Sequence, residues 1–559
     1  MKLKTSFFNQ TIFKKDITRF SPVWILYTIF GLWLGFGNVV YGYDPQGWFA
    51  QSIGASIGPL AIANCGYALV VALCLFGDLF KGRLCNAIHA LPVRREELFV
   101  THTAAGMLFS LVPNTVLSLL FMTAMGDQWV VALLWLLGMT VEYLFFFSLA
   151  AVCAVSTGSR FAMTAVYGLV NVFSIIVWWF INNFYAPLLP GLHLRMTGFD
   201  LFSPVVRLAA DEDLVKFRVL EGYFTTYRFD GLSSGWWYLL ALAVLSFGLL
   251  GLGIFLYRKR KLETAGDFVA FRPMVPVLSA LFTLCVAAVF QAVGYEMSMG
   301  TLSLMVGLVV GCFGTEMLLR RTVKVFHTKT VLKCLAIGVA FGFSLLLTAI
   351  DPLGLTRWTP ETQEVESLVL STDYNYDPSD RYGYHRAGEM TVTDPEMIQQ
   401  IVKIHECLTR DGMTEQDVRY YSRVRAVHLT YKMKNGSTAE RRYYYDIDSD
   451  IARRLQVFWD MPEFLLGYSD WDAFLKTVNY INVSDNEDYR EFTGADAREL
   501  MEAIKADCLT GAIGDDVIYE KNSLWVEICT ENHWVHLALN DHCVNTMKWL
   551  EENRFTVIE

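Results

Sequence analysis

The sequence predicts a polytopic α-helical membrane protein of about nine spans, followed by a C-terminal extracytoplasmic α+β domain. The chain of 559 residues is 53% hydrophobic and only 18% charged, against about 25% charged in an average soluble domain. Residues 1–350 contain 25 Lys and Arg and 17 Asp and Glu, whereas residues 351–559 contain 21 and 39. The apolar residues gather in the first part, which excludes both one uniform soluble globule and a disordered chain.

Nine apolar runs are long enough to cross a bilayer, whose core of about 30 Å takes roughly 20 helical residues. The first run is too long for a cleavable signal peptide, and no small-residue cleavage site follows it. The expected spans are residues 22–41, 54–77, 103–124, 130–153, 162–184, 236–257, 274–294, 301–319 and 331–350.

The positions of Lys and Arg predict the orientation, because basic residues favour cytoplasmic loops. With the N-terminus inside, the expected inner segments contain 19 basic residues, and the outer loops contain five, all in residues 185–235. We therefore expect a multi-pass protein of the cell membrane with a cytoplasmic N-terminus. An odd number of spans places residues 351–559 outside the cell, and the loss of one span would reverse this.

The inner loop at residues 78–102 has the pattern of a short amphipathic helix followed by a rigid break. Apolar residues recur at helical spacing, and a proline disfavours helix at the residue before it. Basic residues flank the apolar ones, which is typical of a docking element for a cytoplasmic protein, although an ordinary inner loop would also fit. The candidate docking residues are Leu84, Ile88, Leu91, Pro92, Arg94 and Arg95.

In this loop the sequence resembles the permease subunits of ABC-2-type transporters, of the Firmicute type with an uncharacterised extracellular C-terminal domain. The matching pattern comprises Ala90-Leu91-Pro92, Arg95 and Leu98-Phe99. The resemblance covers residues 1–262 and implies a six-span permease core with the inner coupling loop 78–102 and the outer loop 185–235. Three further spans in residues 263–350 depart from this six-span pattern.

The resemblance implies that a separate cytoplasmic ABC ATPase subunit docks on the coupling loop, and that a second permease copy or paralogue completes the transporter. This chain has no G-x-x-x-x-G-K-[ST] phosphate loop. We therefore expect ATP and Mg²⁺ on the partner ATPase, no cofactor and no enzymatic activity in this chain, and no nucleic-acid partner. The lipid bilayer is the other expected partner.

Glu142 lies in the middle of the fourth expected span. A carboxylate at this depth costs at least about 2.5 kcal/mol, so Glu142 is a candidate for the membrane path. The alternative is a neutral Glu142 that is hydrogen-bonded to a neighbouring helix. Asn64 and Asn114 are expected to bridge helices in this structural way.

The C-terminal part is expected to contain two β-α-β-β-α modules, in residues 351–477 and 478–559. In the first module, the strands 424–433 and 438–447 flank Asn435-Gly436, the strongest short hairpin signal. His533 and His536 lie three residues apart and point to opposite faces of a strand, which argues against a joint metal site.

The expected function is that of a membrane-spanning permease subunit of an ATP-driven export system, with an outer domain that binds a substrate or partner. One alternative is a membrane receptor or sensor whose outer domain binds a ligand without transport. A second alternative is a membrane enzyme that uses Glu142 or residues of the tail. The enzyme would need converging polar groups, which the sequence does not show.

Overall fold

The computed structural model divides into two compact units. The first unit comprises Met1–Trp178 and Met196–Ala340, and the second comprises Trp179–Arg195 and Phe341–Glu559. The structure describes residues 8–37, 45–185, 188–189, 191–192, 198–210, 214–220, 226–296, 299–352, 354–372, 375–376, 384–385, 388–413, 424–466, 471–484, 489–513, 516–517, 524–530, 534–539 and 542–553.

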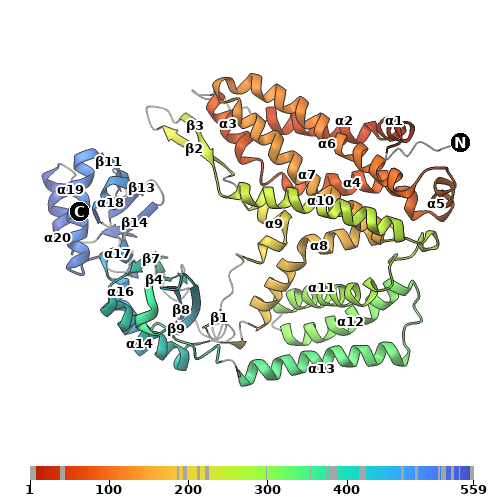
Figure 1. The fold of residues 1–559 in the computed structure, drawn as a ribbon. Coiled ribbons are helices and arrows are strands. Elements are labelled where there is room, and N and C mark those ends of the chain that lie inside the picture. The colour runs from red at the N-terminus through yellow and green to blue at the C-terminus, as the bar shows by residue number, and fades with distance from the viewer. Residues whose placement is uncertain are drawn as a thin grey trace. The chain divides into compact units, whose positions relative to one another are not determined.

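The first unit is built almost entirely of helices, most of which run side by side (Figure 1). A short hairpin, β2 (Val215–Leu220) with β3 (Thr226–Leu232), lies in the expected outer loop 185–235. Helix α13 continues into the second unit. The helices are α1 (Gln10–Arg19), α2 (Ser21–Gly37), α3 (Pro45–Ala55), α4 (Ala61–Leu75), α5 (Gly82–His89), α6 (Arg95–Met125), α7 (Val130–Ser156), α8 (Arg160–Phe180), α9 (Pro204–Ala209), α10 (Gly235–Lys259), α11 (Met274–Glu296), α12 (Gly300–Arg320) and α13 (Thr328–Ile350).

Among the described residues, seven helical segments are long and apolar enough to cross a membrane: those that contain α6, α7, α8, α10, α11, α12 and α13. They correspond to the third to ninth expected spans. The first expected span coincides with α2, which passes the same test only together with α1, and the two helices are bent by 55°.

The second expected span, 54–77, is not one continuous helix. A turn at residues 56–60 separates α3 from α4, and α4 is 15 residues long. Gly58-Pro59 lies in this turn, and proline cannot donate the backbone hydrogen bond that a continuous helix needs. The apolar run is continuous in sequence, so its hydropathy alone does not reveal the break.

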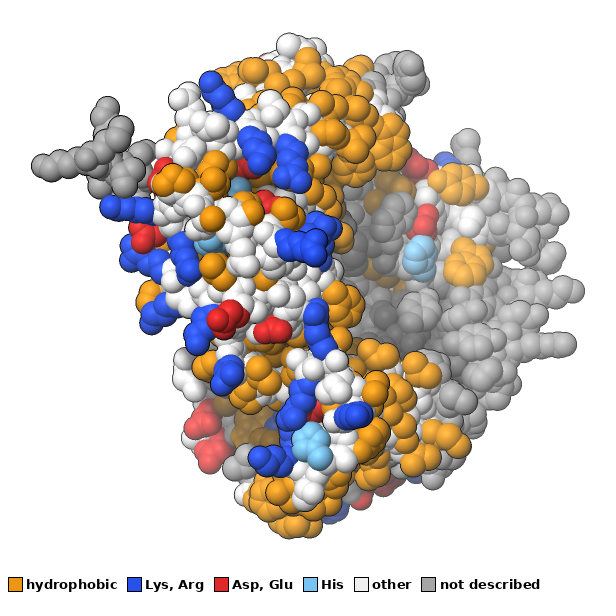
Figure 2. All heavy atoms as spheres, turned by 90° about the vertical axis from the view of Figure 1, so that its right-hand side faces the viewer, with side chains coloured by type: hydrophobic (Ala, Val, Ile, Leu, Met, Phe, Trp, Pro, Cys, Tyr) orange, Lys and Arg blue, Asp and Glu red, His pale blue; other side chains and the backbone are white. Residues whose placement is uncertain are grey.

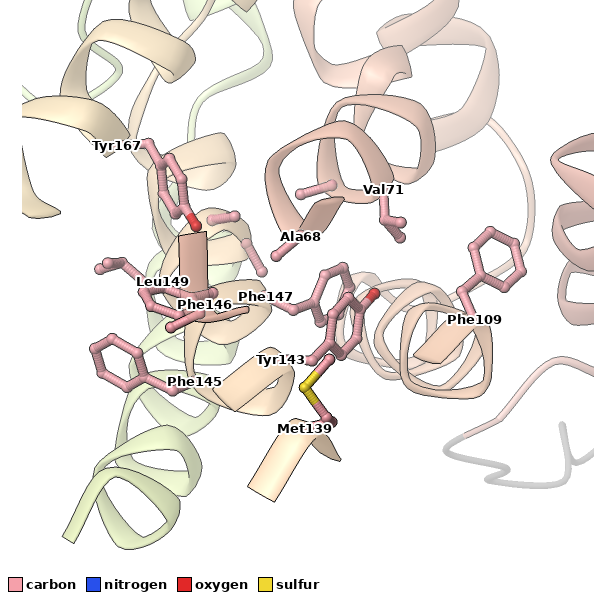
Figure 3. Packing of buried hydrophobic residues seen from close by; sticks show 14 of the residues in the cluster. Ala68, Val71, Phe109, Met139, Tyr143, Phe145, Phe146, Phe147, Leu149 and Tyr167 are labelled. Carbon is pink, nitrogen blue, oxygen red and sulfur yellow. The ribbon is translucent and has the colours of Figure 1, made fainter. Parts of the chain in front are cut away.

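Aromatic side chains of α7 fill the centre of the first unit. Figure 3 shows Tyr143 and Phe147 between α4, which carries Ala68 and Val71, and α6. Their rings stack with centroids 5.6 Å apart. A Cβ atom at Gly106 of α6 would lie 2.2 Å from the Phe147 ring, so only glycine permits this close approach of α6 and α7.

The second unit contains two antiparallel sheets, and helices follow the second and fourth long strands of each. In the first sheet the strand order is β1-β9-β8-β4-β7. Asp394 and Ser449 cap the two helices of this part by accepting hydrogen bonds from backbone N–H groups of the first turn. The elements are β4 (Val365–Thr372), β7 (Gly388–Val392), α14 (Pro395–Asp411), β8 (Val424–Met433), β9 (Thr438–Asp446) and α16 (Asp450–Trp459).

The second sheet has the order β11-β10-β13-β14, which is the order of β7-β4-β8-β9 in the first sheet. Each module has one strand more than expected within its own sequence, β7 in the first and β11 in the second, so the order in both is β-β-α-β-β-α; the first sheet also gains β1 from outside the module. The elements are β10 (Val478–Ser484), β11 (Tyr489–Thr493), α19 (Gly494–Leu509), β13 (Leu524–Thr530), β14 (Trp534–Leu539) and α20 (Val544–Glu552).

The first sheet also contains a strand from a distant part of the sequence. Gly191 and Leu192 form β1, which pairs with Arg442 and Arg441 of β9. Gly191 has a φ of 78°, and a Cβ atom there would lie 2.3 Å from the Tyr443 side chain. Both observations require glycine at this position. Three shorter strands, β5 (Asn375–Tyr376), β6 (Tyr384–His385) and β12 (Asp516–Val517), form a separate small sheet.

Candidate functional site

The expected docking loop folds as a short helix between two long ones. A 3₁₀ turn, Gly77–Phe80, leads into α5, which ends at His89. Arg94 is extended, and α6 begins at Arg95. The break around Pro92 therefore lies where the sequence indicates, and α5 is fixed at both ends by the neighbouring helices.

The candidate docking residues divide into an outward and an inward set. Leu84 and Leu91 are exposed by 42% and 48%. By contrast, Ile88 packs against the core of the first unit. Among the basic candidates, Arg94 is exposed but Arg95 is half-buried. The accessible docking residues are Leu84, Leu91, Pro92 and Arg94.

His89 and Arg95 hold the docking helix to the end of α10. His89 Nδ1 donates to the carbonyl of Cys85 at 2.7 Å, and its Nε2 then accepts from the Tyr257 hydroxyl at 3.2 Å. Burial lowers the pKa of His89, which favours this neutral form, and the nearby guanidinium of Arg95 acts in the same direction. Arg95 donates to the carbonyl of Arg260 at 2.6 Å.

Arg260 is a buried connector that the sequence did not single out. It is 3% exposed, and its guanidinium donates to the carbonyls of Ala154, Val155 and Leu79 at 2.8 to 3.0 Å. The first two carbonyls end α7, where the helix dipole favours a cation. In the sequence Arg260 is one of four consecutive basic residues, so no local signal distinguishes it from its exposed neighbours.

A buried pair of polar side chains holds the N-terminal helix α1 against α6. His102 Nδ1 and Asp16 Oδ2 are 2.6 Å apart, and both side chains are buried. Thr101 Oγ1 accepts from the backbone N–H of Asn9, which also caps α1. These contacts join α1 to the beginning of α6, and their partners are too far apart in sequence to be paired by inspection.

Exposed basic side chains gather on the face of the first unit that carries α5. Figure 2 shows this face, with Lys and Arg over α1, α5 and the ends of the neighbouring helices. The exposed basic residues at these places are Lys14, Lys15, Arg19, Lys81, Arg83, Arg94, Arg160, Arg258, Lys259, Lys261, Arg272, Arg320, Arg321, Lys324 and Lys329.

Glu142 is fully buried in the first unit and belongs to a cluster that links four helices. Its Oε2 accepts from Asn64 Nδ2 at 2.9 Å. The Tyr27 hydroxyl lies 3.1 Å from the Oδ1 atoms of both Asn64 and Asn114. Asn114 Nδ2 in turn donates to Ser110 Oγ at 2.9 Å. The expected helix-bridging role of Asn64 and Asn114 is confirmed.

One of the two carboxyl oxygens of Glu142 makes no hydrogen bond in this cluster. Glu142 Oε1 is buried and has no hydrogen-bond partner in the described part of the chain. A cavity of about 70 Å³ lies beside the cluster, bounded by Tyr27 and Met139 and otherwise mostly by apolar side chains. The arrangement suits a polar contact inside an apolar path, and equally suits a bridge between helices.

Of the two histidines near the C-terminus that the sequence analysis considered, His533 lies outside the described residues. His536 faces Glu527, with 3.7 Å between Nδ1 and Oε1. Within the described ranges, no group of three His, Cys, Asp or Glu residues is arranged to hold a metal ion.

Comparisons with known proteins do not assign the chain. No family model matches it, and neither a curated protein nor a solved structure does.

Proposed function

We propose that the chain is the membrane-spanning permease subunit of an ATP-driven export system of the ABC-2 type. The observation that carries this proposal is the segment around α5, in which Leu84 of the helix and Leu91, two residues beyond its end, are exposed within a basic surface. An apolar pair surrounded by cations suits a partner with an apolar cleft and an acidic rim. The partner would be a cytoplasmic ATPase that binds ATP and Mg²⁺.

The proposed topology has nine crossings, with α3 and α4 together forming the second. The basic face in Figure 2 would then be cytoplasmic. Among the expected outer residues, Arg207, Arg218 and Arg228 form ion pairs with Asp200, Asp230 and Asp127. These ion pairs neutralise three of the five basic residues in the expected outer loop. The excess of unpaired positive charge on the inner side is therefore larger, which supports the same orientation. The second unit would be extracellular, and its two sheets of equal strand order would be tandem copies of one module.

The transport mechanism would be indirect. Closure of the ATPases would displace α5, and the contacts of α5 and Arg95 with the end of α10 would transmit the movement to the long helices. Arg260 would carry it further to the end of α7. A second permease copy or paralogue would complete the path, with Glu142 as a polar contact on it. The outer domain would bind a substrate or a partner.

A co-purification experiment tests the proposal. Tagged full-length chain is expected to retain an ATPase from its native membrane. Leu84→Ala with Leu91→Ala removes two half-exposed leucines, whose remaining burial is worth about 1.5 to 3 kcal/mol together. The expected loss is about 10- to 100-fold in affinity.

The matched control is Leu201→Ala with Leu232→Ala. These leucines lie in the expected outer loop and are exposed to a similar degree, 50% and 48%. The control should retain the ATPase in full. Equal retention by both double variants would exclude α5 as the dock. Co-purification of a kinase in place of an ATPase would favour the receptor alternative.

A further inference from the structure

In the described part of the C-terminal unit, the second sheet has one face that the helices α19 and α20 do not cover. Phe492 on the opposite face packs against Trp549 of α20, with ring centroids 5.3 Å apart. Ile481 and Val483 are fully buried on that same helix-covered face. Residues between them in sequence point to the other side, because successive side chains of a strand alternate.

A row of polar residues crosses this uncovered face. In the sheet register, Glu491 pairs with Asn482, Asn482 with Glu527, and Glu527 with His536. One residue from each of the four strands therefore lies in a single line. Glu491 and the His536 side chain are exposed, and Glu527 is partly exposed.

Asn482 at the centre of this row has an unused acceptor. Its Nδ2 donates to Glu527 Oε2 at 3.1 Å, which fixes the orientation of the amide because a carboxylate can only accept. Its Oδ1 is buried and has no hydrogen-bond partner among the described residues. The residue as a whole is only 8% exposed. A buried acceptor without a donor costs free energy, and a ligand that donates would remove this cost.

Aromatic side chains border the polar row on both sides. Tyr480 precedes Asn482 by two residues on β10, and Tyr489 and Trp525 lie on the row beyond it, paired through Ser484. Tyr489 and Trp525 are exposed. Burial, the neighbouring Cys529 and the negative charge of Glu527 and Glu491 raise the pKa of Tyr480 to about 12. The face therefore combines negative charge with aromatic rings.

The fold does not require this composition. In the first sheet, Val369 lies between the buried Leu368 and Leu370 as Asn482 lies between Ile481 and Val483. The corresponding row there consists of Thr391, Val369, Thr430 and Glu440. A sheet of the same order thus forms with an apolar residue at the centre, so the strand order does not depend on the carboxylate and amide groups of the second sheet.

We propose that the uncovered face of β11, β10, β13 and β14 binds an extended peptide with a basic residue flanked by apolar ones. An Arg or Lys side chain would donate to Asn482 Oδ1 and pair with Glu491 and Glu527, and a guanidinium would also stack on Trp525. Side chains two residues apart in an extended peptide are separated by about 6.7 Å, as are adjacent rows of the sheet. Apolar side chains at positions −2 and +2 would therefore meet the aromatic rows.

The charge of the C-terminal part agrees with a basic ligand, because residues 351–559 contain 39 acidic and 21 basic residues. The inference specifies the binding role that we propose for the outer domain, but binding to this face needs no ATPase. Peptide binding and ATPase retention can therefore succeed or fail separately.

The test uses full-length protein in detergent and a fluorescently labelled heptapeptide amide, Gly-Leu-Ser-Arg-Ser-Leu-Gly, followed by anisotropy at low salt. Saturable binding is expected, weakened at least 10-fold by Glu491→Gln with Glu527→Gln. The matched control Glu440→Gln changes the equivalent row of the first sheet and should bind as the unaltered protein does. Thermal melting of each variant verifies that the fold is retained.

Two further ligands define the chemistry. Replacing arginine by citrulline keeps the shape and removes the charge, and should weaken binding at least 10-fold. Spermidine carries charge without apolar side chains and should compete poorly. Absence of saturable binding, or equal binding of the peptide to the double variant, would overturn the proposal. Equal binding of the citrulline peptide would overturn it too, and strong competition by spermidine would replace the peptide with a polyamine.

Discussion

His405 is expected to make the first module of the second unit sensitive to acid. It lies on α14, fully buried between two tyrosines. The Tyr431 hydroxyl is 2.9 Å from Nδ1, and the Tyr443 hydroxyl is 3.0 Å from Nε2. A neutral imidazole has one donor and one acceptor and so suits both hydroxyls. Burial, with a smaller contribution from Arg441, lowers the pKa of His405 to about 3.

The sign and size of the effect follow from this value. The unfolded chain binds a proton at His405 below pH of about 6.5, whereas the folded module does so only below about 3. Above pH 6.5, the ionisation of His405 therefore does not change the free energy of unfolding. As the pH falls from 6.5 toward 3, the free energy of unfolding decreases by about 1.4 kcal/mol per pH unit. At pH 4.5 the loss should be about 2.7 kcal/mol.

Hydrogen exchange of the full-length chain measures this loss. Peptides covering residues 398–408 should lose about 100-fold in protection between pH 6.5 and 4.5, after correction for intrinsic exchange rates. His405→Gln offers a donor and an acceptor but does not titrate, so its pH dependence should be shallower by that amount. Residues 497–504 of α19 serve as an internal control. The same pH dependence in both proteins would refute the assignment to His405.

Three other predictions concern topology, the buried carboxyl and the second module. Ser437→Cys, in the exposed β8–β9 turn, should react with a membrane-impermeant thiol reagent on intact cells, whereas Asn86→Cys on α5 should react only after lysis; the reverse pattern would move the second unit to the cytoplasm. Glu142→Gln should lower ATP-coupled transport if the titratable proton is needed, but unchanged transport together with unfolding of Glu142→Leu would leave Glu142 only a structural role. Asp507 accepts two hydrogen bonds each from Asn545 and Thr546 at the start of α20, so Asp507→Ala should destabilise the second module by about 2 to 4 kcal/mol. The loss is measured as reduced hydrogen-exchange protection of α19 and α20 in the full-length chain, and unchanged protection would contradict it.

The sequence predicts those elements that carry a local signal. The hairpin around Asn435-Gly436 is confirmed, because turn chemistry acts within a few residues. The strands β7 and β11 were missed, since each is five residues long and leads almost directly into a helix. The expected second span was wrong as a single helix, because Gly58-Pro59 interrupts an apolar run without lowering its hydropathy.

The sites were harder to predict than the elements. The break at Pro92 locates the docking helix, but the helical spacing of Leu84, Ile88 and Leu91 does not reveal that Ile88 faces inward. Tertiary packing decides this. The row from Glu491 to His536 is drawn from four strands, and only their register aligns it. Arg260 is likewise defined by carbonyls distant in sequence, which no local pattern encodes.

The pairing of β1 with β9 has a consequence for the order of synthesis. Gly191 and Arg442 are neighbours in the sheet, yet the ribosome produces them about 250 residues apart. At the typical rate of 5 to 20 residues per second, the Gly191 segment waits at least about 12 seconds for its partner strand. Over that interval a chaperone or a neighbouring chain can occupy it. A chimaera that carries residues 351–559 on another permease would lack this strand, expose the edge of β9 and invite self-association.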